Sequence, residues 1–281
     1  MTRGEARRKR RALRRAPYGM AETTTSLDGK PVRALTSGAL QGSPELVFVP
    51  GLGAPGYLAP WARESATWTR ATLLDLPGWR GGRPRSCAAT LPGVASATAD
   101  WLQATDRHHV ILLGHSTGAQ AVLRTALQVP DRVTGVVLAG PTFDPAVRTI
   151  SALIRRAAPT ILHERPAELL AAGPSYLHSG GLPLLRFLLS ALPDRPEDLI
   201  PLLTAPVLVI TGKHDGFAPP AWARHLAALA SAPCVVLPGA HNAPFPHPRE
   251  ADAAVREFTL TGCAGRLSGG AAYVVGRAPV L

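Results

Sequence analysis

The sequence predicts an α/β fold with a mostly parallel sheet of eight strands and helices on both faces. Six short apolar segments recur along the chain, and most are separated by helical windows. These segments are apolar throughout instead of alternating with polar residues, which is typical of parallel strands covered on both faces. A chain of 281 residues with 46% hydrophobic content can form one large core of this kind.

The strands can be assigned in order along the chain. Residues 23–36 form a hairpin, because Asp28-Gly29 is a strong signal for a tight turn. The six apolar strands follow at residues 46–49, 72–74, 110–113, 133–138, 207–211 and 234–237.

Three helices are indicated by apolar stripes. The first follows residue 116 and ends near Pro130, with apolar residues recurring at helical spacing. The other two begin at Pro219-Pro220 and at Pro248, and proline is well tolerated at a first helical position.

The basic charge is concentrated at the N-terminus. Residues 1–15 carry eight Lys or Arg and one Glu, which is +7 of the net +11. We interpret residues 1–21 as a disordered basic extension without specificity for nucleic acid, although such an arm is also suited to nonspecific contact with phosphates or an anionic membrane. At the other end, we expect residues 259–281 to be a flexible tail, because glycines recur there.

The expected location is the cytoplasm. No apolar stretch follows the basic arm, as a secretory signal would require, and no run approaches the ~18 apolar residues of a membrane span. Cys87, Cys234 and Cys263 are scattered, odd in number and without metal-ligand spacing, which fits a reduced compartment.

The strand at residues 110–113 leads directly into Gly114-His115-Ser116-Thr117-Gly118. Glycines two positions before and after a serine allow a sharp strand-to-helix turn that exposes the hydroxyl. The pattern therefore indicates a nucleophile elbow with Ser116 as the nucleophile.

A serine nucleophile needs a base, and the base needs an orienting acid. Asp215 and His241 each follow an apolar strand, in the usual chain order of serine, acid and histidine. Asp144, which follows another strand, is the alternative acid, whereas we expect His115 and His214 to be structural.

Together with the Pro50-Gly51-Leu52-Gly53 loop and Asp75-Leu76-Pro77-Gly78-Trp79, these motifs resemble the α/β-hydrolase superfamily over roughly residues 22 to 258. The resemblance implies a core at residues 22–141 and 204–258 and a helical cap inserted at residues 142–203. It also implies an oxyanion hole formed by the N–H groups of Leu52 and Thr117. Pro50 stands where the family more often has histidine, which leaves these backbone donors intact.

Seven further residues are candidates for the substrate pocket. Three aromatic residues are candidates for its entrance, with packing in the core or at the rim as an equally good alternative, and three polar residues of the cap are candidates for substrate contact. Asp75, by contrast, is expected to be a structural anchor. The pocket candidates are Gly51, Tyr57, Trp61, Trp79, His163, Tyr176 and His178.

The expected function is a serine hydrolase that cleaves a small or medium apolar carboxylic ester, thioester or lactone through an acyl-enzyme. The expected partner is a small-molecule substrate, with no cofactor and no metal, and the oligomeric state stays open. One alternative keeps the fold but acts as a lyase, a cofactor-free oxidase or a ligand receptor.

A second alternative is an NAD-dependent oxidoreductase. Gly51, Gly53 and Gly56 match G-x-G-x-x-G after a strand, and Asp75 lies about the right distance onward. Pro55 disfavours this interpretation, because it supplies no N–H donor where the pyrophosphate-binding helix would begin.

Overall fold

The structure, a computed structural model, describes residues 17–53, 55–79, 85–164, 166, 170 and 179–263. The basic residues 1–16, the pocket candidates Tyr176 and His178, and residues 264–281 lie outside this part of the chain. The described elements begin with a 3-10 helix at Pro17–Gly19 and a strand at Ala21, and Met20 between them is buried. The last helix continues to Thr261, and Thr259 and Cys263 are buried. The expected domain limits stay predictions.

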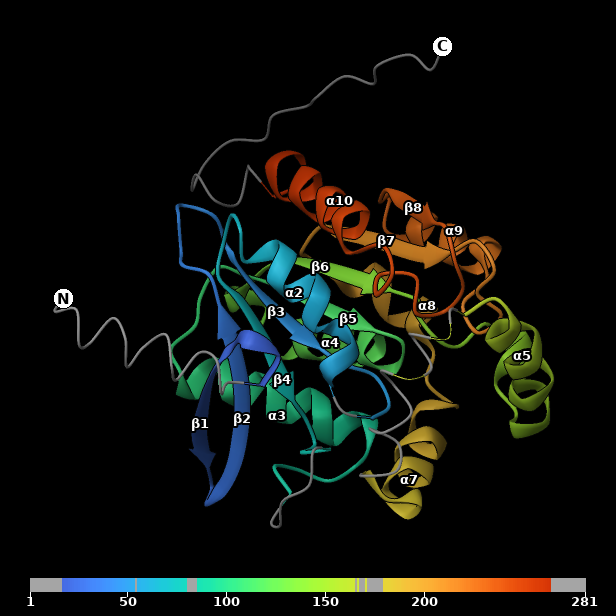
Figure 1. Cartoon of the computed structure of the whole chain (residues 1–281), viewed down its shortest axis with the longest axis horizontal. Helices are drawn as coiled ribbons and strands as arrows, with labels where there is room; N and C mark the ends of the chain where they lie inside the picture. The colour runs from blue at the N-terminus through green and yellow to red at the C-terminus, as the bar shows by residue number, and fades with distance from the viewer. Residues whose placement is uncertain are drawn as a thin grey trace, which may run out of the picture.

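One sheet of eight strands organises the molecule (Figure 1). Its spatial order is β1-β2-β4-β3-β5-β6-β7-β8. β1 and β2 form the predicted hairpin, β2 runs antiparallel to β4, and every other neighbouring pair is parallel. The strands are β1 (Ala21–Leu27), β2 (Lys30–Ser37), β3 (Glu45–Val49), β4 (Ala71–Asp75), β5 (Val110–His115), β6 (Val133–Ala139), β7 (Val207–Gly212) and β8 (Cys234–Leu237).

Helices cover both faces of the sheet and divide the core into two layers. In Figure 1, α2 and α10 lie in front of the sheet, and the core on the other face is formed with α3, α4 and α9. The α-helices are α2 (Ala59–Ser65), α3 (Leu91–Ala104), α4 (Thr117–Gln128), α5 (Ile150–Leu162), α7 (Gly181–Ala191), α8 (Pro196–Leu199), α9 (Pro220–Leu229) and α10 (Pro248–Thr261). The 3-10 helices after Gly19 are η2 (Pro55–Leu58), η3 (Pro130–Arg132), η4 (Pro145–Val147) and η5 (Ile200–Leu202).

The central strands are apolar throughout because both of their faces are buried. In β5, Val110 and Leu112 belong to the core layer of α3 and α4, whereas Ile111 and Leu113 belong to the layer of α2 and α10. Alternate side chains of a strand point to opposite faces, so each strand here contributes to two cores. This arrangement confirms the predicted fold class.

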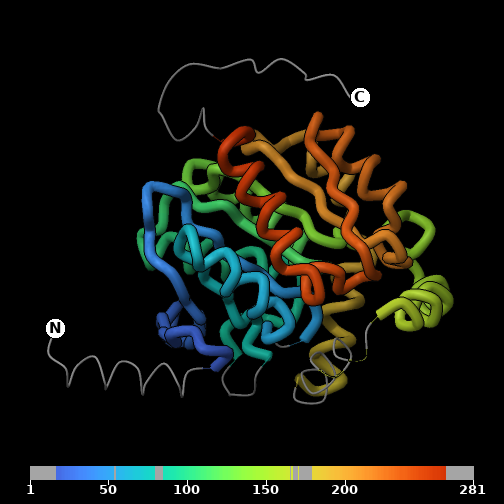
Figure 2. Tube along the Cα trace, turned by 45° about the horizontal axis from the view of Figure 1, so that its top comes forward, coloured from blue at the N-terminus to red at the C-terminus, as the bar shows by residue number. Residues whose placement is uncertain are grey.

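The described part of the long connection between β6 and β7 is mainly helical. It contains η4, α5, α7, α8 and η5. α5 and α7 lie at the edge of the sheet where β6 and β7 end (Figures 1 and 2). The limits of a cap at residues 142–203 stay a prediction.

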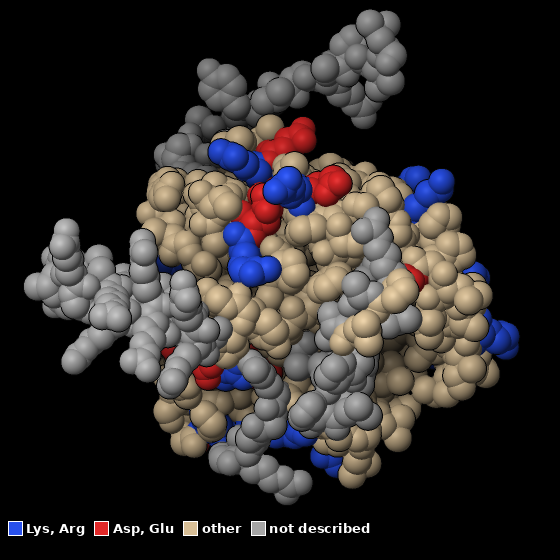
Figure 3. Space-filling model, viewed as in Figure 1, with Lys and Arg blue, Asp and Glu red and all other residues tan. Residues whose placement is uncertain are grey.

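The described surface carries charges of both signs. Figure 3 shows acidic and basic side chains next to each other over α10 and α2. In α10 the exposed charged residues include Arg249, Glu250, Arg256 and Glu257. Within the described part of the chain, no helix is both long and apolar enough to cross a membrane.

Candidate active site

Ser116 lies in the sharp turn between β5 and α4. Its φ of 58° and ψ of −128° are angles that residues with a side chain rarely adopt. The flanking glycines are required by close packing. A Cβ on Gly114 would lie 2.2 Å from the Gly118 carbonyl oxygen, and a Cβ on Gly118 would lie 2.3 Å from the Val49 carbonyl oxygen.

The structure brings Ser116, Asp215 and His241 into one hydrogen-bonded line. His241 Nε2 lies 2.9 Å from Ser116 Oγ, and His241 Nδ1 lies 2.8 Å from Asp215 Oδ2. The three residues follow β5, β7 and β8, which are parallel strands of one sheet. The carboxyl ends of parallel strands meet at the same edge, which is where open α/β sheets place their ligands.

The local electrostatics favour an ionised acid beside a basic imidazole. Burial alone would raise the pKa of Asp215, but the His241 ring and the N–H groups of Phe217 and Ala218 outweigh burial and hold it below its usual value. Burial alone would lower the pKa of His241, but the Asp215 carboxylate outweighs burial and raises it above 6.5. Each partner therefore stabilises the charged form of the other.

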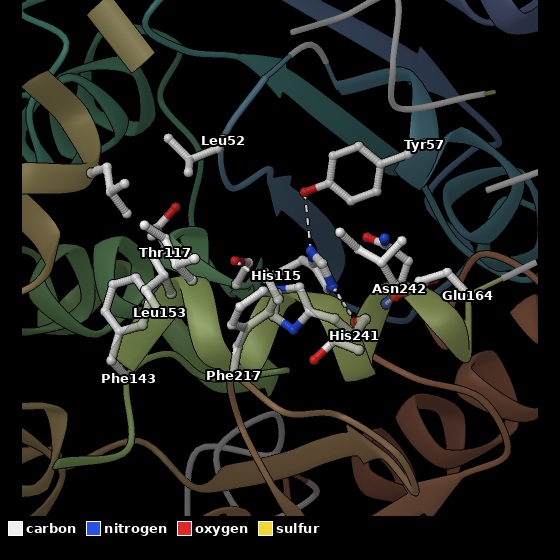
Figure 4. Close-up of a pocket in the computed structure, with 16 residues that line it drawn as sticks. Leu52, Tyr57, His115, Thr117, Phe143, Leu153, Glu164, Phe217, His241 and Asn242 are labelled. Atoms are coloured by element: carbon white, nitrogen blue, oxygen red, sulfur yellow. Dashed lines mark hydrogen bonds between the residues drawn. The ribbon is translucent and has the colours of Figure 1, made fainter. Parts of the chain in front are cut away.

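A cavity of about 470 Å³ opens at Ser116 and His241. Its wall is mainly apolar (Figure 4). Helices α5 and α7 and two loops provide this apolar lining, through Leu153, Ile154, Ile161, Leu188, Phe143 and Phe217.

The segment after β3 lies against the turn that holds Ser116. A Cβ on Gly51 would lie 2.8 Å from Ser116 Cβ, and both Leu52 and Thr117 line the cavity. This close packing disfavours the dinucleotide-binding alternative, because a pyrophosphate needs space beside the glycines of its motif.

Of the aromatic pocket candidates, Tyr57 lines the cavity, whereas Trp61 and Trp79 do not. Both tryptophans are fully buried in the core. Trp61 packs edge-to-face on Phe48, with ring centroids 5.5 Å apart, and Trp79 packs in the same way on Phe187 at 5.8 Å. Their large apolar rings are better satisfied by core packing than at a cavity wall.

Two polar candidates also lie away from the cavity lining. His163 is exposed and stacks on His214, with ring centroids 4.4 Å apart. Asp144 accepts the N–H of Ala146 at 2.8 Å and caps η4, so the alternative acid is engaged elsewhere. Asp75 is buried and accepts the N–H of Trp79 at 3.0 Å, in agreement with an anchoring role.

The polar residues of the cavity that were not predicted as site residues include Glu164 and His115. Glu164 follows α5, and its Oε1 accepts the backbone N–H of Asn242 at 2.9 Å. Its Oε2 is buried without a hydrogen-bond partner in the described structure, and burial raises the pKa of this carboxyl. His115 lies within the serine motif, but its partners, Tyr57 and the His241 carbonyl, are distant in the sequence. Among the described residues, no group of three His, Cys, Asp or Glu side chains is placed to hold a metal ion.

Residues 46–254 match the model of the alpha/beta hydrolase family. The chain belongs to this family. The matched region includes the Leu52 segment, Ser116, Asp215 and His241.

Curated relatives of this hydrolase-family chain match it over shorter stretches. A 1-acylglycerol-3-phosphate O-acyltransferase of Arabidopsis thaliana is 32% identical over 123 residues, which are 42% of this chain and 29% of the relative. The dihydrolipoyllysine-residue acetyltransferase component of an acetoin cleaving system from Cupriavidus necator is 31% identical over 127 residues, which are 44% of this chain and 33% of the relative. The matched part of the chain thus spans about a third or less of the length of these relatives.

Solved structures share the hydrolase fold over most of the chain. A thermophilic esterase from Thermogutta terrifontis has a TM-score of 0.67 at 20% identity, covering 87% of this chain and 99% of that one. The enol-lactonase from Burkholderia xenovorans LB400 has a TM-score of 0.68 at 18% identity, covering 85% and 100%. At these identities the similarity establishes the fold.

Proposed function

We propose that the protein is a serine hydrolase that cleaves a small or medium apolar carboxylic ester, thioester or lactone through an acyl-enzyme intermediate. The observation that carries the proposal is the hydrogen-bonded line from Ser116 through His241 to Asp215 at an apolar cavity. The family match and the fold shared with an esterase and a lactonase support it.

In this mechanism His241 moves the proton while Ser116 forms the covalent bond. His241 Nε2 takes the Ser116 hydroxyl proton as Oγ attacks the substrate carbonyl carbon, and then gives it to the leaving oxygen or sulfur as that bond breaks. A water molecule, activated by the same nitrogen, attacks the acyl-enzyme and releases the carboxylic acid. Asp215 holds the imidazole in the required tautomer and stabilises its protonated form.

The negative charge on the carbonyl oxygen would be stabilised by the N–H groups of Leu52 and Thr117. Thr117 is the first residue of α4, where N–H groups have no partner inside the helix. Leu52 lies in the segment packed against Ser116 and lines the cavity. Loss of one such donor typically costs about 3 kcal/mol of transition-state stabilisation.

The lining of the cavity supports an apolar substrate. Burial of an acyl chain against Leu153, Ile154 and Leu188 would remove apolar surface from water, worth about 0.8 kcal/mol for each CH₂ group. Chain length should therefore affect kcat/KM until the cavity is full.

A second candidate activity is transfer of the acyl group to an alcohol instead of water. The similarity to a protein named as an O-acyltransferase favours it, and the same acyl-enzyme would serve both reactions. Analysis of products formed in the presence of glycerol separates them, because transfer yields a glycerol ester and hydrolysis yields the free acid.

The direct test is fluorophosphonate labelling of the wild-type protein and Ser116→Ala, followed by turnover of p-nitrophenyl esters of increasing acyl length. We expect a labelled wild type, an unlabelled alanine variant, and an inactive but folded His241→Ala protein. Label retained on Ser116→Ala would refute the assignment of the nucleophile.

A further inference from the structure

The peptide group between His241 and Asn242 is held by a side chain on each of its two edges. On one edge the His241 carbonyl oxygen accepts a hydrogen bond from His115 Nε2 at 2.9 Å. On the other edge the Asn242 N–H donates to Glu164 Oε1 at 2.9 Å. Because His115 ends β5 and Glu164 follows α5, the loop of the proposed base is attached to two separate parts of the fold.

The tautomer of His115 gives these bonds a direction. A carbonyl oxygen can only accept, so His115 Nε2 carries the hydrogen. Burial, helped by the neighbouring His241, lowers the pKa of His115 to about 3, which keeps the ring neutral. Its Nδ1 therefore accepts, and the Tyr57 hydroxyl at 3.0 Å donates to it (Figure 4).

The same hydroxyl oxygen accepts the N–H of Gly51 at 2.9 Å. A continuous chain of bonds thus runs from Gly51 through Tyr57 and His115 to the carbonyl of His241. Gly51 directly precedes Leu52, and His115 directly precedes Ser116. This chain of hydrogen bonds therefore contacts the three loops that carry the proposed oxyanion donor, nucleophile and base.

We propose that Tyr57 and His115 are positioning residues. Their chain of hydrogen bonds fixes the His241 loop and the Leu52 loop in their positions relative to Ser116. Glu164 supports the opposite edge of the 241–242 peptide. This inference rests on the proposed function, because the loops matter only if Ser116 and His241 react.

Core packing alone does not account for these polar residues. Tyr57 and His115 are both buried, and their rings are in edge contact with centroids 5.2 Å apart. Apolar side chains of similar volume could fill such a space, whereas each buried polar group is costly unless it is paired. Here every polar atom of the His115 ring is paired, and each bond leads toward a loop of the site.

Two substitutions of His115 distinguish the hydrogen bond at its Nε2 from the hydrogen bond at its Nδ1. Glutamine can place its amide N–H near the position of Nε2 and keep the donor to the His241 carbonyl, whereas asparagine can reach only the Nδ1 side. We expect His115→Asn to lower kcat by up to about 100-fold with little change in KM, because a misplaced base affects the reaction more than binding. His115→Gln should recover most of this loss.

Tyr57→Phe removes the bonds to Gly51 and His115 together, and we expect a similar fall in kcat. Ser65→Ala is the matched control, because it removes a buried hydrogen bond to Asp252 between α2 and α10, away from the cavity. It should lower thermal stability without changing kcat. Wild-type kcat in both Tyr57→Phe and His115→Asn would overturn the proposal while leaving Ser116 labelling, and thus the proposed function, intact.

A measurement that does not depend on activity tests the hydrogen-bond chain directly. Imidazole ¹⁵N NMR, assigned with the His115 variants, should show His115 neutral with its hydrogen on Nε2 from about pH 5 to about pH 9. In Tyr57→Phe the Nδ1 resonance should move, because its donor is gone.

If the wild type is neither labelled nor active, the proposed function fails, and the positioning role fails with it. If it is labelled and active but His115 carries its hydrogen on Nδ1, the positioning chain alone is refuted.

Discussion

At Ser116 the backbone adopts angles that cost on the order of 1–3 kcal/mol for a residue with a side chain. The surrounding packing holds this conformation, because Gly114 and Gly118 let the turn approach its neighbours within distances that no Cβ could occupy. The result is a hydroxyl 2.9 Å from His241 Nε2 without any rearrangement of the loop.

The pH dependence of the reaction should follow the ionisation of His241. General-base action needs the neutral imidazole, and the Asp215 carboxylate outweighs burial to raise the pKa of His241. We therefore expect kcat/KM to rise with pH, with a midpoint above 6.5. A pH profile measured with a p-nitrophenyl ester checks this, and a midpoint below 6.5 would contradict the pairing.

Asp215→Asn should reduce kcat by about 10⁴-fold, because an amide does not enforce the tautomer that leaves Nε2 free to accept the serine proton. Asp144→Asn is the control, since Asp144 is half-buried, accepts the N–H of Ala146 and does not line the cavity. Its activity should be close to that of the wild type. The opposite ranking of the two variants would assign the acid to Asp144.

Among the elements, the junction of β5 and α4 tolerates the least change. The Cβ of Gly114→Ala would lie 2.2 Å from a backbone oxygen that cannot move aside, so the turn would have to open. We expect the free energy of unfolding to fall by at least about 1–3 kcal/mol. Fluorophosphonate labelling should be lost as well.

Gly181→Ala is the matched control for that substitution. Gly181 is the first residue of α7, and a Cβ there would meet nothing within 4 Å. Chemical denaturation should show a protein as stable as the wild type or more stable by up to about 1 kcal/mol. Equal effects of the two substitutions would show that close packing at the turn is not the cause.

On the scale of the whole molecule, α7 is part of the main core although it lies in the connection between β6 and β7. Phe187 is 1% exposed and packs on Trp79, and the Gln120 side chain donates to the Ala191 carbonyl at 3.2 Å. We therefore expect α7 to unfold together with the sheet as one cooperative unit.

Phe187→Ala should lower the free energy of unfolding by about 3–5 kcal/mol, because it leaves a cavity in that core. Leu182→Ala in the same helix removes a side chain that is 74% exposed, and its effect should stay within about 0.5 kcal/mol. Denaturant unfolding followed by two probes should show one transition for both. A separate early transition in Phe187→Ala would indicate that α7 unfolds independently of the sheet.

The sequence by itself determined the fold class, the strand positions and the three residues of the hydrogen-bonded line. Strands buried on both faces must be apolar at every position, and the elbow needs glycine at positions 114 and 118, so these features appear as local patterns. Asp215 and His241 could be found because parallel strands end at one edge, which turns chain order into a spatial expectation.

Only the tertiary structure decided which side chains from distant segments meet around these residues. It places Trp61 and Trp79 in the core instead of the pocket, and it brings Glu164 to Asn242, 78 positions onward. The direction of the bonds at His115 also depends on partners from distant segments, Tyr57 and His241. Such contacts have no local pattern, because packing between remote segments determines which side chains meet and which polar atoms find a partner.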